Sequence, residues 1–241
     1  MSEPVIRRAG LTDALAAAKS EIGGVLLILG LAASLLAFLA VADSVAGGYT
    51  RAFDHGLMSL LHPGGGSRTI GPAWLAQAIL DLTALGSITD LCVIALLAAG
   101  LLAAQGRWRQ GWLLIAAPLS GLIVLNIFKR VFDRPRPPLA LHAVVVGNAS
   151  FPSGHAMLSA VVYLTLGALL AHFAERRRIK AYALAAGMVL TLTIGASRVY
   201  LGVHWPTDVI AGWALGAAWA MLWWLLVWFF EQRRSAREAL T

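Results

Sequence analysis

The chain has 241 residues, of which 59% are hydrophobic and only 13% charged, about half the charged share of an average soluble domain. The formal charge of +7 does not indicate a nucleic-acid partner, because the basic residues cluster at the ends of apolar segments, as in membrane proteins. A single cysteine, Cys92, excludes an internal disulfide and a cysteine-rich metal site. Composition therefore favours an all-α, polytopic membrane protein over a soluble helical domain.

Six apolar segments approach the roughly 20 residues that cross a bilayer. We predict transmembrane helices at residues 22–42, 88–104, 111–128, 155–173, 181–197 and 209–230. No cleavable signal peptide is expected, because residues 1–19 are polar and mixed and the first apolar segment is too long for one. The length suits a single six-helix membrane domain over residues 1–241.

Two further segments, 52–62 and 72–85, lie between the first and second predicted spans. They carry apolar residues at helical spacing but are too short or too polar to cross a bilayer. We expect helices that lie in the membrane interface or beside the bundle, joined by a flexible turn at 63–67. In an alternative interpretation, residues 70–85 are part of a longer, tilted span.

The positions of Lys and Arg predict the orientation, because cytoplasmic loops carry an excess of these residues. With the N-terminus in the cytoplasm, that side holds the larger share of the 19 Lys and Arg residues. Segments 1–20 and 231–241 are then both cytoplasmic. Most basic residues of the other side fall in polar clusters at span ends, where chemistry explains them better than topology does.

The first polar cluster follows the third predicted span and contains four cations: Lys129, Arg130, Arg134 and Arg136. Lipid-anchoring basic residues are expected on the cytoplasmic side, whereas this cluster is predicted on the opposite side. Neighbouring prolines stiffen the backbone that carries the guanidinium groups. Because Arg recognises phosphate through paired hydrogen bonds and Lys supplies a point charge, the cluster indicates an anion site.

The second cluster, Pro-Ser-Gly-His at 152–155, opens the fourth span. Ser153 is placed to cap the helix, and Gly154 lets a ligand approach the backbone closely. Free N–H groups at the helix start favour an anion, which would lie beside His155. A simple helix cap with an interfacial histidine explains this cluster equally well when it is taken alone.

The third cluster, residues 197–208, joins the fifth and sixth spans and contains Arg198, His204 and Asp208. The four-residue spacing brings the carboxylate of Asp208 against the ring of His204 at a helix start, where it fixes the tautomer and stabilises a positive ring. A purely structural Asp–His pair is the alternative. Ionisable groups at membrane depth are costly, which favours a functional role.

The clusters together supply cations, two histidines, an orienting carboxylate and a helix N-terminus. Phosphoryl transfer requires mainly positioning and electrostatic stabilisation of the phosphate oxygens. No group of carboxylates in the sequence suits a pair of Mg²⁺ ions, so we expect neither a metal nor a cofactor.

These residues resemble the type 2 phosphatidic acid phosphatase family, which is related to the vanadium haloperoxidases. The motifs of the family are K-x6-RP, PSGH and SR-x5-H-x3-D, and all three are present in order. Lys129 and Arg136 match the first motif, 152–155 the second, and Ser197 to Asp208 the third.

The resemblance implies the role of each residue. His204 would be the nucleophile that forms a phosphohistidine, Asp208 would orient it, and His155 would protonate the leaving group and then activate water. The remaining residues implied by the resemblance would bind the phosphate oxygens: Lys129, Arg136, Ser153, Gly154 and Arg198. The resemblance also implies catalysis without a metal.

Three alternatives use the same residues. A vanadate-dependent haloperoxidase shares the oxyanion site, but those enzymes are soluble. A non-catalytic lipid-phosphate binder or transporter would not require His204 paired with Asp208. A phosphotransferase would pass the phosphate to a second lipid, which the motifs do not exclude.

The predicted partners are a phosphorylated lipid and the bilayer. Candidate substrates are undecaprenyl diphosphate, phosphatidylglycerol phosphate, phosphatidic acid and lipid A phosphate. Short loops favour a bacterial inner-membrane enzyme with a periplasmic active site, to which segments 52–62 and 72–85 could control lateral access. The sequence leaves the oligomeric state open, since Gly212 and Gly216 suit helix packing within the bundle or between subunits.

Overall fold

The structure, a computed structural model, describes residues 4–144, 146–147 and 149–238, and the side chains of residues 21–230 in these ranges and of Arg233. The regular secondary structure of the described residues is entirely helical, and no strand occurs among them. The helices are α1 (Pro4–Ala46), α2 (Arg51–Leu61), α3 (Ala73–Ala84), α4 (Ile88–Ala104), α5 (Trp108–Phe132), the short 3₁₀ helix η1 (Leu139–Leu141), α6 (Gly154–Phe173), α7 (Arg177–Tyr200) and α8 (Pro206–Glu238).

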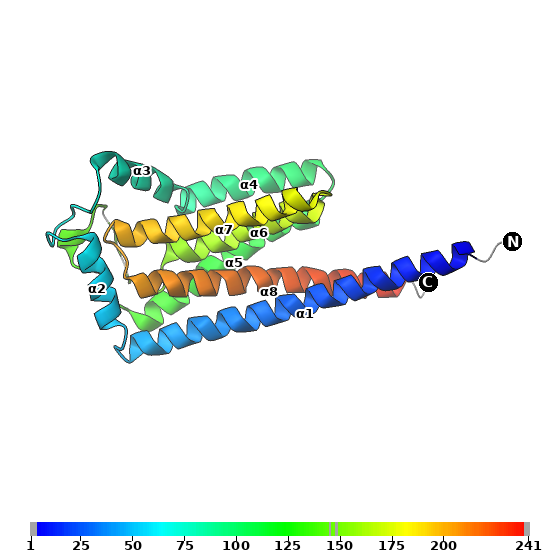
Figure 1. Ribbon diagram of the computed structural model, residues 1–241, viewed down its shortest axis with the longest axis horizontal. Coiled ribbons are helices and arrows are strands. Elements are labelled where there is room, and N and C mark those ends of the chain that lie inside the picture. Colours follow the sequence, from blue (N-terminus) through cyan, green and yellow to red (C-terminus); the bar gives the residue numbers. More distant parts are fainter. Residues whose placement is uncertain (1–3, 145, 148, 239–241) are drawn as a thin grey trace.

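Five helical segments are long and apolar enough to cross a membrane: Glu21–Ala46, Trp108–Phe132, Gly154–Phe173, Arg177–Tyr200 and Pro206–Phe230. A sixth is formed when α3 and α4 count as one bent span. The prediction of an all-α protein with six spans is therefore confirmed. α1 begins and α8 ends at the same end of the bundle (Figure 1). Parts of the predicted terminal segments, residues 1–3 and 239–241, lie outside the described residues.

The pair α3 and α4 combines the two interpretations of residues 72–85. The helices together have the length and hydropathy of one span, but they are bent by 52° at the break between them. Figure 1 shows α3 at an angle to α4 at one end of the bundle. Gly86 occupies the break, where a Cβ would overlap Cγ2 of Ile194 and lie 3.1 Å from Cδ2 of His155, so glycine allows the bend to approach α7 and this ring.

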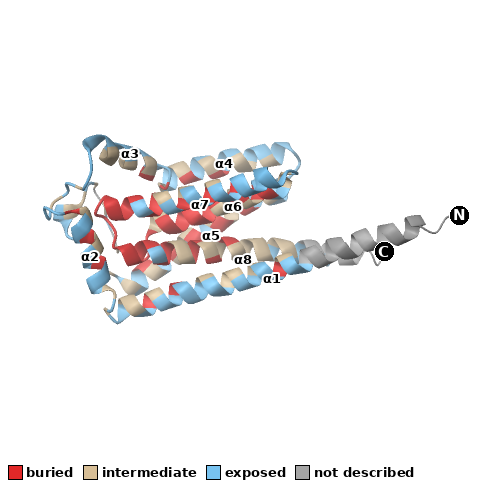
Figure 2. Cartoon of the chain, viewed as in Figure 1, coloured by how far each residue is buried: buried red, intermediate tan, exposed pale blue. Residues whose placement is uncertain are grey.

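Burial is uneven among the helices (Figure 2). α6 is the most buried span, with residues such as Met157 and Val161 fully enclosed by its neighbours. α1 instead exposes Leu26, Leu36 and many other large apolar side chains. Water would not tolerate so continuous an apolar surface, so these side chains face the lipid.

Small residues allow α6 to pack closely against α7 and α8. A Cβ on Gly187 of α7 would lie 2.5 Å from the carbonyl oxygen of Tyr163, and one on Gly212 of α8 would lie 2.7 Å from that of Ser153. Gly216 meets α6 one turn further along. Gly212 and Gly216 thus pack within the bundle, and their contacts carry no information about oligomerisation.

We predict that Gly187→Ala destabilises the fold, because the added methyl group overlaps the backbone of α6 and forces the helices apart. The expected cost is about 1–3 kcal/mol. The thermal unfolding midpoint of the purified protein in detergent would measure it. Gly100→Ala is the matched control, since Gly100 of α4 has open space around it; equal midpoints for the two variants would contradict the prediction.

Candidate active site

The three polar clusters meet at the end of the bundle opposite the start of α1. They surround a cavity of about 230 Å³. Its lining includes residues from all three clusters: Lys129, Arg136, Gly154, His155, Arg198 and His204. Ser153 and Asp208 are buried directly behind this lining. The structure therefore brings close together the residues to which the family resemblance assigns roles, whereas Arg130 is exposed and, like Arg134, does not line the cavity.

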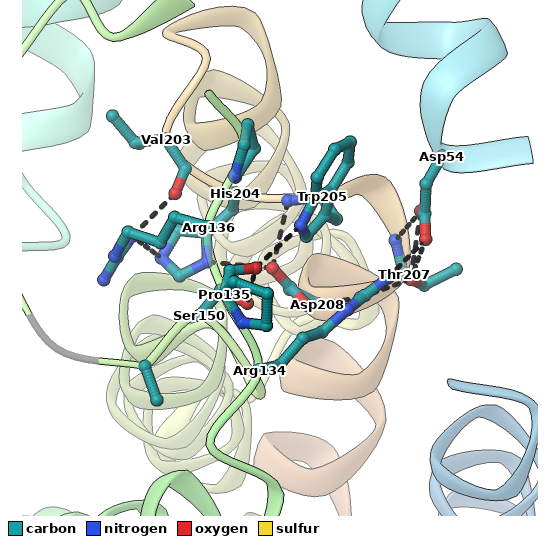
Figure 3. Close-up of polar contacts among 12 residues, drawn as sticks. Asp54, Arg134, Pro135, Arg136, Ser150, Val203, His204, Trp205, Thr207 and Asp208 are labelled. Carbon is teal, nitrogen blue, oxygen red and sulfur yellow. Dashed lines mark hydrogen bonds and ion pairs between the residues drawn. The ribbon is translucent and has the colours of Figure 1, made fainter. Parts of the chain in front are cut away.

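The first cluster divides its cations between two sides of the chain. Lys129, in the last turn of α5, donates a hydrogen bond to the carbonyl oxygen of Ala149 at 2.5 Å. Nη1 of Arg136 donates to the carbonyl oxygen of Val203 at 2.6 Å and lies 3.1 Å from Nε2 of His204. Both residues line the cavity, whereas Arg134 turns away from it toward Asp54 and Asp208 (Figure 3).

The second cluster places a helix start against the cavity. Ser153 precedes the first residue of α6, and its backbone N–H donates to the carbonyl oxygen of Asp208 at 2.9 Å. Its side chain makes no capping hydrogen bond, contrary to the expected cap, and the buried hydroxyl has no partner. An unpaired buried hydroxyl is costly, so this group is suited to an oxyanion.

Arg198 is held by a residue that sequence analysis did not single out. Nη1 of Arg198 donates to Oγ1 of Thr83 at 3.0 Å, and Ser197 Oγ donates to the same oxygen at 2.8 Å. Thr83 lies in the last turn of α3, beside the bend at Gly86. Nε of Arg198 is buried without a partner, so this guanidinium retains a donor for a ligand.

The His204–Asp208 pair has the geometry expected of an oriented imidazole. Nδ1 of His204 lies 3.3 Å from Oδ2 of Asp208, which also accepts the backbone N–H of Trp205 at 3.0 Å. On the other side of the ring, Nε2 faces the guanidinium of Arg136. A guanidinium can only donate, so this contact requires an unprotonated Nε2, and the ring proton then sits on Nδ1.

The environment of His204 keeps the ring neutral. Burial lowers the pKa of His204 from 6.5 to about 4, and nearby Arg136 and Lys129 lower it further, while the hydrogen bond and charge of Asp208 partly offset these effects. A neutral ring has a lone pair on Nε2, directed toward the cavity. Burial likewise lowers the pKa of Arg136 below its usual value, an effect that the negative charge of Asp208 partly offsets.

Three further residues complete the arrangement behind the cavity: Asp54, Arg134 and Thr207. Asp54, in α2, accepts hydrogen bonds from Arg134 at 2.7 Å and from the backbone N–H of Thr207 at 3.0 Å. Sequence reasoning assigned Arg134 to the anion site and gave Asp54 no role. The sequence signal for Asp54 was its position, since it is a carboxylate in a short amphipathic helix close to the predicted membrane surface. Among the described residues, no group of three or more His, Cys, Asp or Glu side chains is arranged to hold a metal ion.

Comparison with known proteins identifies the family. The sequence pattern of the PAP2 superfamily matches residues 110–232, which include all three motifs. The chain belongs to the PAP2 superfamily. It is 31% identical over 169 residues to phosphatidylglycerophosphatase B of Bacillus subtilis, a match that covers 68% of this chain and 80% of that protein.

Two further similarities agree with this assignment. A lipid A 1-phosphatase of Rhizobium johnstonii is 34% identical over 130 residues, covering 48% of this chain and 46% of that protein. The crystal structure of the first transmembrane PAP2 type phosphatidylglycerolphosphate phosphatase from Bacillus subtilis has a TM-score of 0.72 at 27% identity, covering 84% of this chain and 96% of that chain. The family resemblance is confirmed, and this PAP2 protein is a multi-pass membrane lipid phosphatase whose chemistry is metal-independent.

We predict that this PAP2 phosphatase keeps its activity well below pH 6.5. Because the pKa of His204 is lowered to about 4, the ring loses its lone pair only as the pH falls through that value, not through 6.5. The acidic limb of kcat/KM, which reports the free enzyme, would measure this pKa. Two lipid phosphates whose own second pKa values differ separate substrate ionisation from enzyme ionisation. A limb near 6.5 or above with both substrates would contradict the prediction.

Proposed function

We propose that the chain hydrolyses a lipid phosphate in two steps through His204. In the first step, Nε2 of His204 attacks the phosphorus, a P–N bond forms, and the P–O bond to the lipid breaks while His155 gives a proton to the leaving oxygen. In the second step, His155 takes a proton from water, the water oxygen bonds to the phosphorus, and the P–N bond breaks, which returns the lone pair to Nε2 of His204 and releases inorganic phosphate. Asp208 stabilises the positive ring of the intermediate.

The observation that carries this proposal is the position of Nε2 of His204 at a cavity surrounded by cations. Lys129, Arg136 and Arg198 would hold the phosphate oxygens, together with the hydroxyl of Ser153 and the backbone at Gly154. Charge that develops on these oxygens in the transition state would meet donors already in place, which is the main requirement of phosphoryl transfer.

An apolar groove supports a lipid as the substrate. It has a volume of about 240 Å³, is lined by α4, α5 and α6, and shares Ile88, Leu122 and Leu158 with the polar cavity. A substrate would place its phosphate at the histidines and its hydrocarbon chain in this groove, reaching the site from the side. Neither α2 nor α3 lines the groove, so we propose that α4 and α5 control lateral access, in place of the expected segments 52–62 and 72–85.

For the head group, we propose phosphatidylglycerol phosphate as the first substrate to test. A relative matched over 80% of its own length is named a phosphatidylglycerophosphatase. Undecaprenyl diphosphate, phosphatidic acid and lipid A phosphate are the comparison substrates. We further propose a bacterial inner-membrane location with both termini in the cytoplasm and the site facing the periplasm, on the basis of the Lys and Arg distribution.

The nucleophile assignment predicts that His204→Ala lowers kcat by a factor on the order of 10³ or more, since the covalent route is lost. Phosphate release from the four lipids, measured in EDTA with the purified protein, tests this. His172→Ala is the matched control, because His172 is an exposed histidine of α6 outside the cavity. Turnover retained in His204→Ala would remove the nucleophile assignment. Phosphate that appears on a second lipid instead of in solution would show transfer in place of hydrolysis.

If the C-terminus is cytoplasmic, a reporter fused after residue 241 should be active when it folds in the cytoplasm and inactive when it folds only in the periplasm. A fluorescent protein that folds in the cytoplasm should fluoresce, and an alkaline phosphatase that folds in the periplasm should be inactive at the same position. The reverse pattern would place the active site on the cytoplasmic face and would leave the chemistry unaffected.

A further inference from the structure

Asp54 is a buried carboxylate on a helix that the three motifs do not include. Its side chain is 1% exposed, although α2 exposes Phe53 and Leu60 on its other faces. A carboxylate buried this deeply is stable only with partners at both oxygens. Oδ1 accepts from the backbone N–H and the hydroxyl of Thr207, each at 3.0 Å, and Oδ2 accepts from Arg134 at 2.7 Å.

Arg134 connects Asp54 to the proposed orienting carboxylate. Its Nη2 binds Asp54, and its Nη1 donates to Oδ1 of Asp208 at 2.6 Å (Figure 3). The other oxygen of Asp208 faces His204 at 3.3 Å. One guanidinium thus lies between two buried carboxylates, and only one of the carboxylates contacts the histidine.

Charge determines what this arrangement does. A guanidinium paired with Asp208 alone would cancel much of the negative charge that stabilises a positive His204 ring. Asp54 shares the guanidinium, so the group of two carboxylates and one cation keeps one net negative charge beside the ring. In a buried environment that charge acts strongly on a neighbouring group.

From this geometry we infer that Asp54 and Arg134 are positioning residues of the phosphatase, which hold Asp208 in place and preserve its negative charge toward His204. Neither residue lines the cavity that holds the histidines; both line a separate polar cavity of about 500 Å³ beside Trp205. They therefore act through Asp208 and do not touch substrate. The inference rests on the proposed roles of His204 and Asp208.

The test begins with Asp54→Asn, which keeps the shape of the side chain and removes its charge. We expect kcat and the rate of phosphohistidine formation to fall together by a factor on the order of 10 to 100, as for loss of a buried charged hydrogen bond. KM should stay within about twofold of the wild-type value, because the variant changes a charge that matters in the transition state and not a substrate contact.

A second variant separates charge from architecture. Asp54→Asn combined with Arg134→Gln restores one net negative charge beside His204, so the double variant should be faster than Asp54→Asn alone. The amide of Gln can still donate to Asp208 but carries no charge. If the network only held Asp208 in place, this weaker contact would loosen it further, and the double variant would be slower than Asp54→Asn. A double variant slower than Asp54→Asn overturns the inference, as does wild-type kcat in Asp54→Asn.

Two controls match these variants. Asp43→Asn removes an exposed carboxylate from the same end of the bundle, outside the network, and should leave kcat unchanged. Met58→Ala weakens the packing of α2 against the bundle and leaves the ion pairs in place. A loss of kcat equal to that of Asp54→Asn would show that only the packing of α2 matters, and it would overturn the inference.

Folding and the proposed function are checked separately. Size-exclusion profiles and unfolding midpoints report folding. If Asp54→Asn does not accumulate, Arg134→Lys is assayed in its place. We expect Arg134→Lys to lose less kcat than Asp54→Asn, and a wild-type kcat in this variant would overturn the inference. His204→Ala is assayed in parallel. Turnover in His204→Ala removes the proposed nucleophile, whereas an inactive His204→Ala beside a fully active Asp54→Asn removes only the role of Asp54.

Discussion

Asp208 is the residue on which the geometry of the site depends, because it fastens four separate segments of the chain to one another. Its carboxylate accepts the backbone N–H of Trp205, faces His204 and pairs with Arg134. Its carbonyl oxygen accepts the backbone N–H of Ser153, which precedes α6. Through Arg134 the same residue reaches α2. The loop after α5, the start of α6, the turn before α8 and the interfacial helix therefore share a single anchor, fixed at the first turn of α8.

Buried polar atoms around this anchor differ from those around the cavity, and the difference indicates where a ligand belongs. Behind His204, the oxygens of Asp54 and Asp208 all have partners, so the cost of burying their charge is offset. On the cavity side, Ser153 Oγ and Arg198 Nε have none. Unpaired donors beside three cations lower the stability of the ligand-free fold. A bound phosphate would pair these donors and offset the charge of the cations, so its binding would stabilise the fold.

Much of the fold and most of the cavity could be predicted from the sequence, because span length and motif spacing are local properties. The 52° bend between α3 and α4 could not, because the close approach of Gly86 at the break to Ile194 and His155 is a tertiary contact that no local pattern reports. The pairing of Asp54 with Arg134 joins residues 80 positions apart, which no spacing rule reports. The opposite directions of Arg134 and Arg136 could not be predicted from spacing either, because residues two apart in an extended chain point to the same side. Their directions follow from their separate partners, Asp54 and Asp208 for Arg134 and Val203 and His204 for Arg136.

The different directions of Arg134 and Arg136 allow one short basic segment to serve two purposes. Arg136 enters the cavity and contacts His204, where a phosphate oxygen would lie, while Arg134 enters the network behind the histidine. Two cations that both faced the substrate would add attraction in the ground state and the transition state alike, which improves binding more than rate. A cation placed behind Asp208, balanced by Asp54, instead adjusts the group that must stabilise the positive ring. In the proposed mechanism, the Arg-Pro-Arg sequence would thus divide substrate binding from support of the nucleophile, beside an apolar groove from which a lipid would bring its phosphate to the histidines.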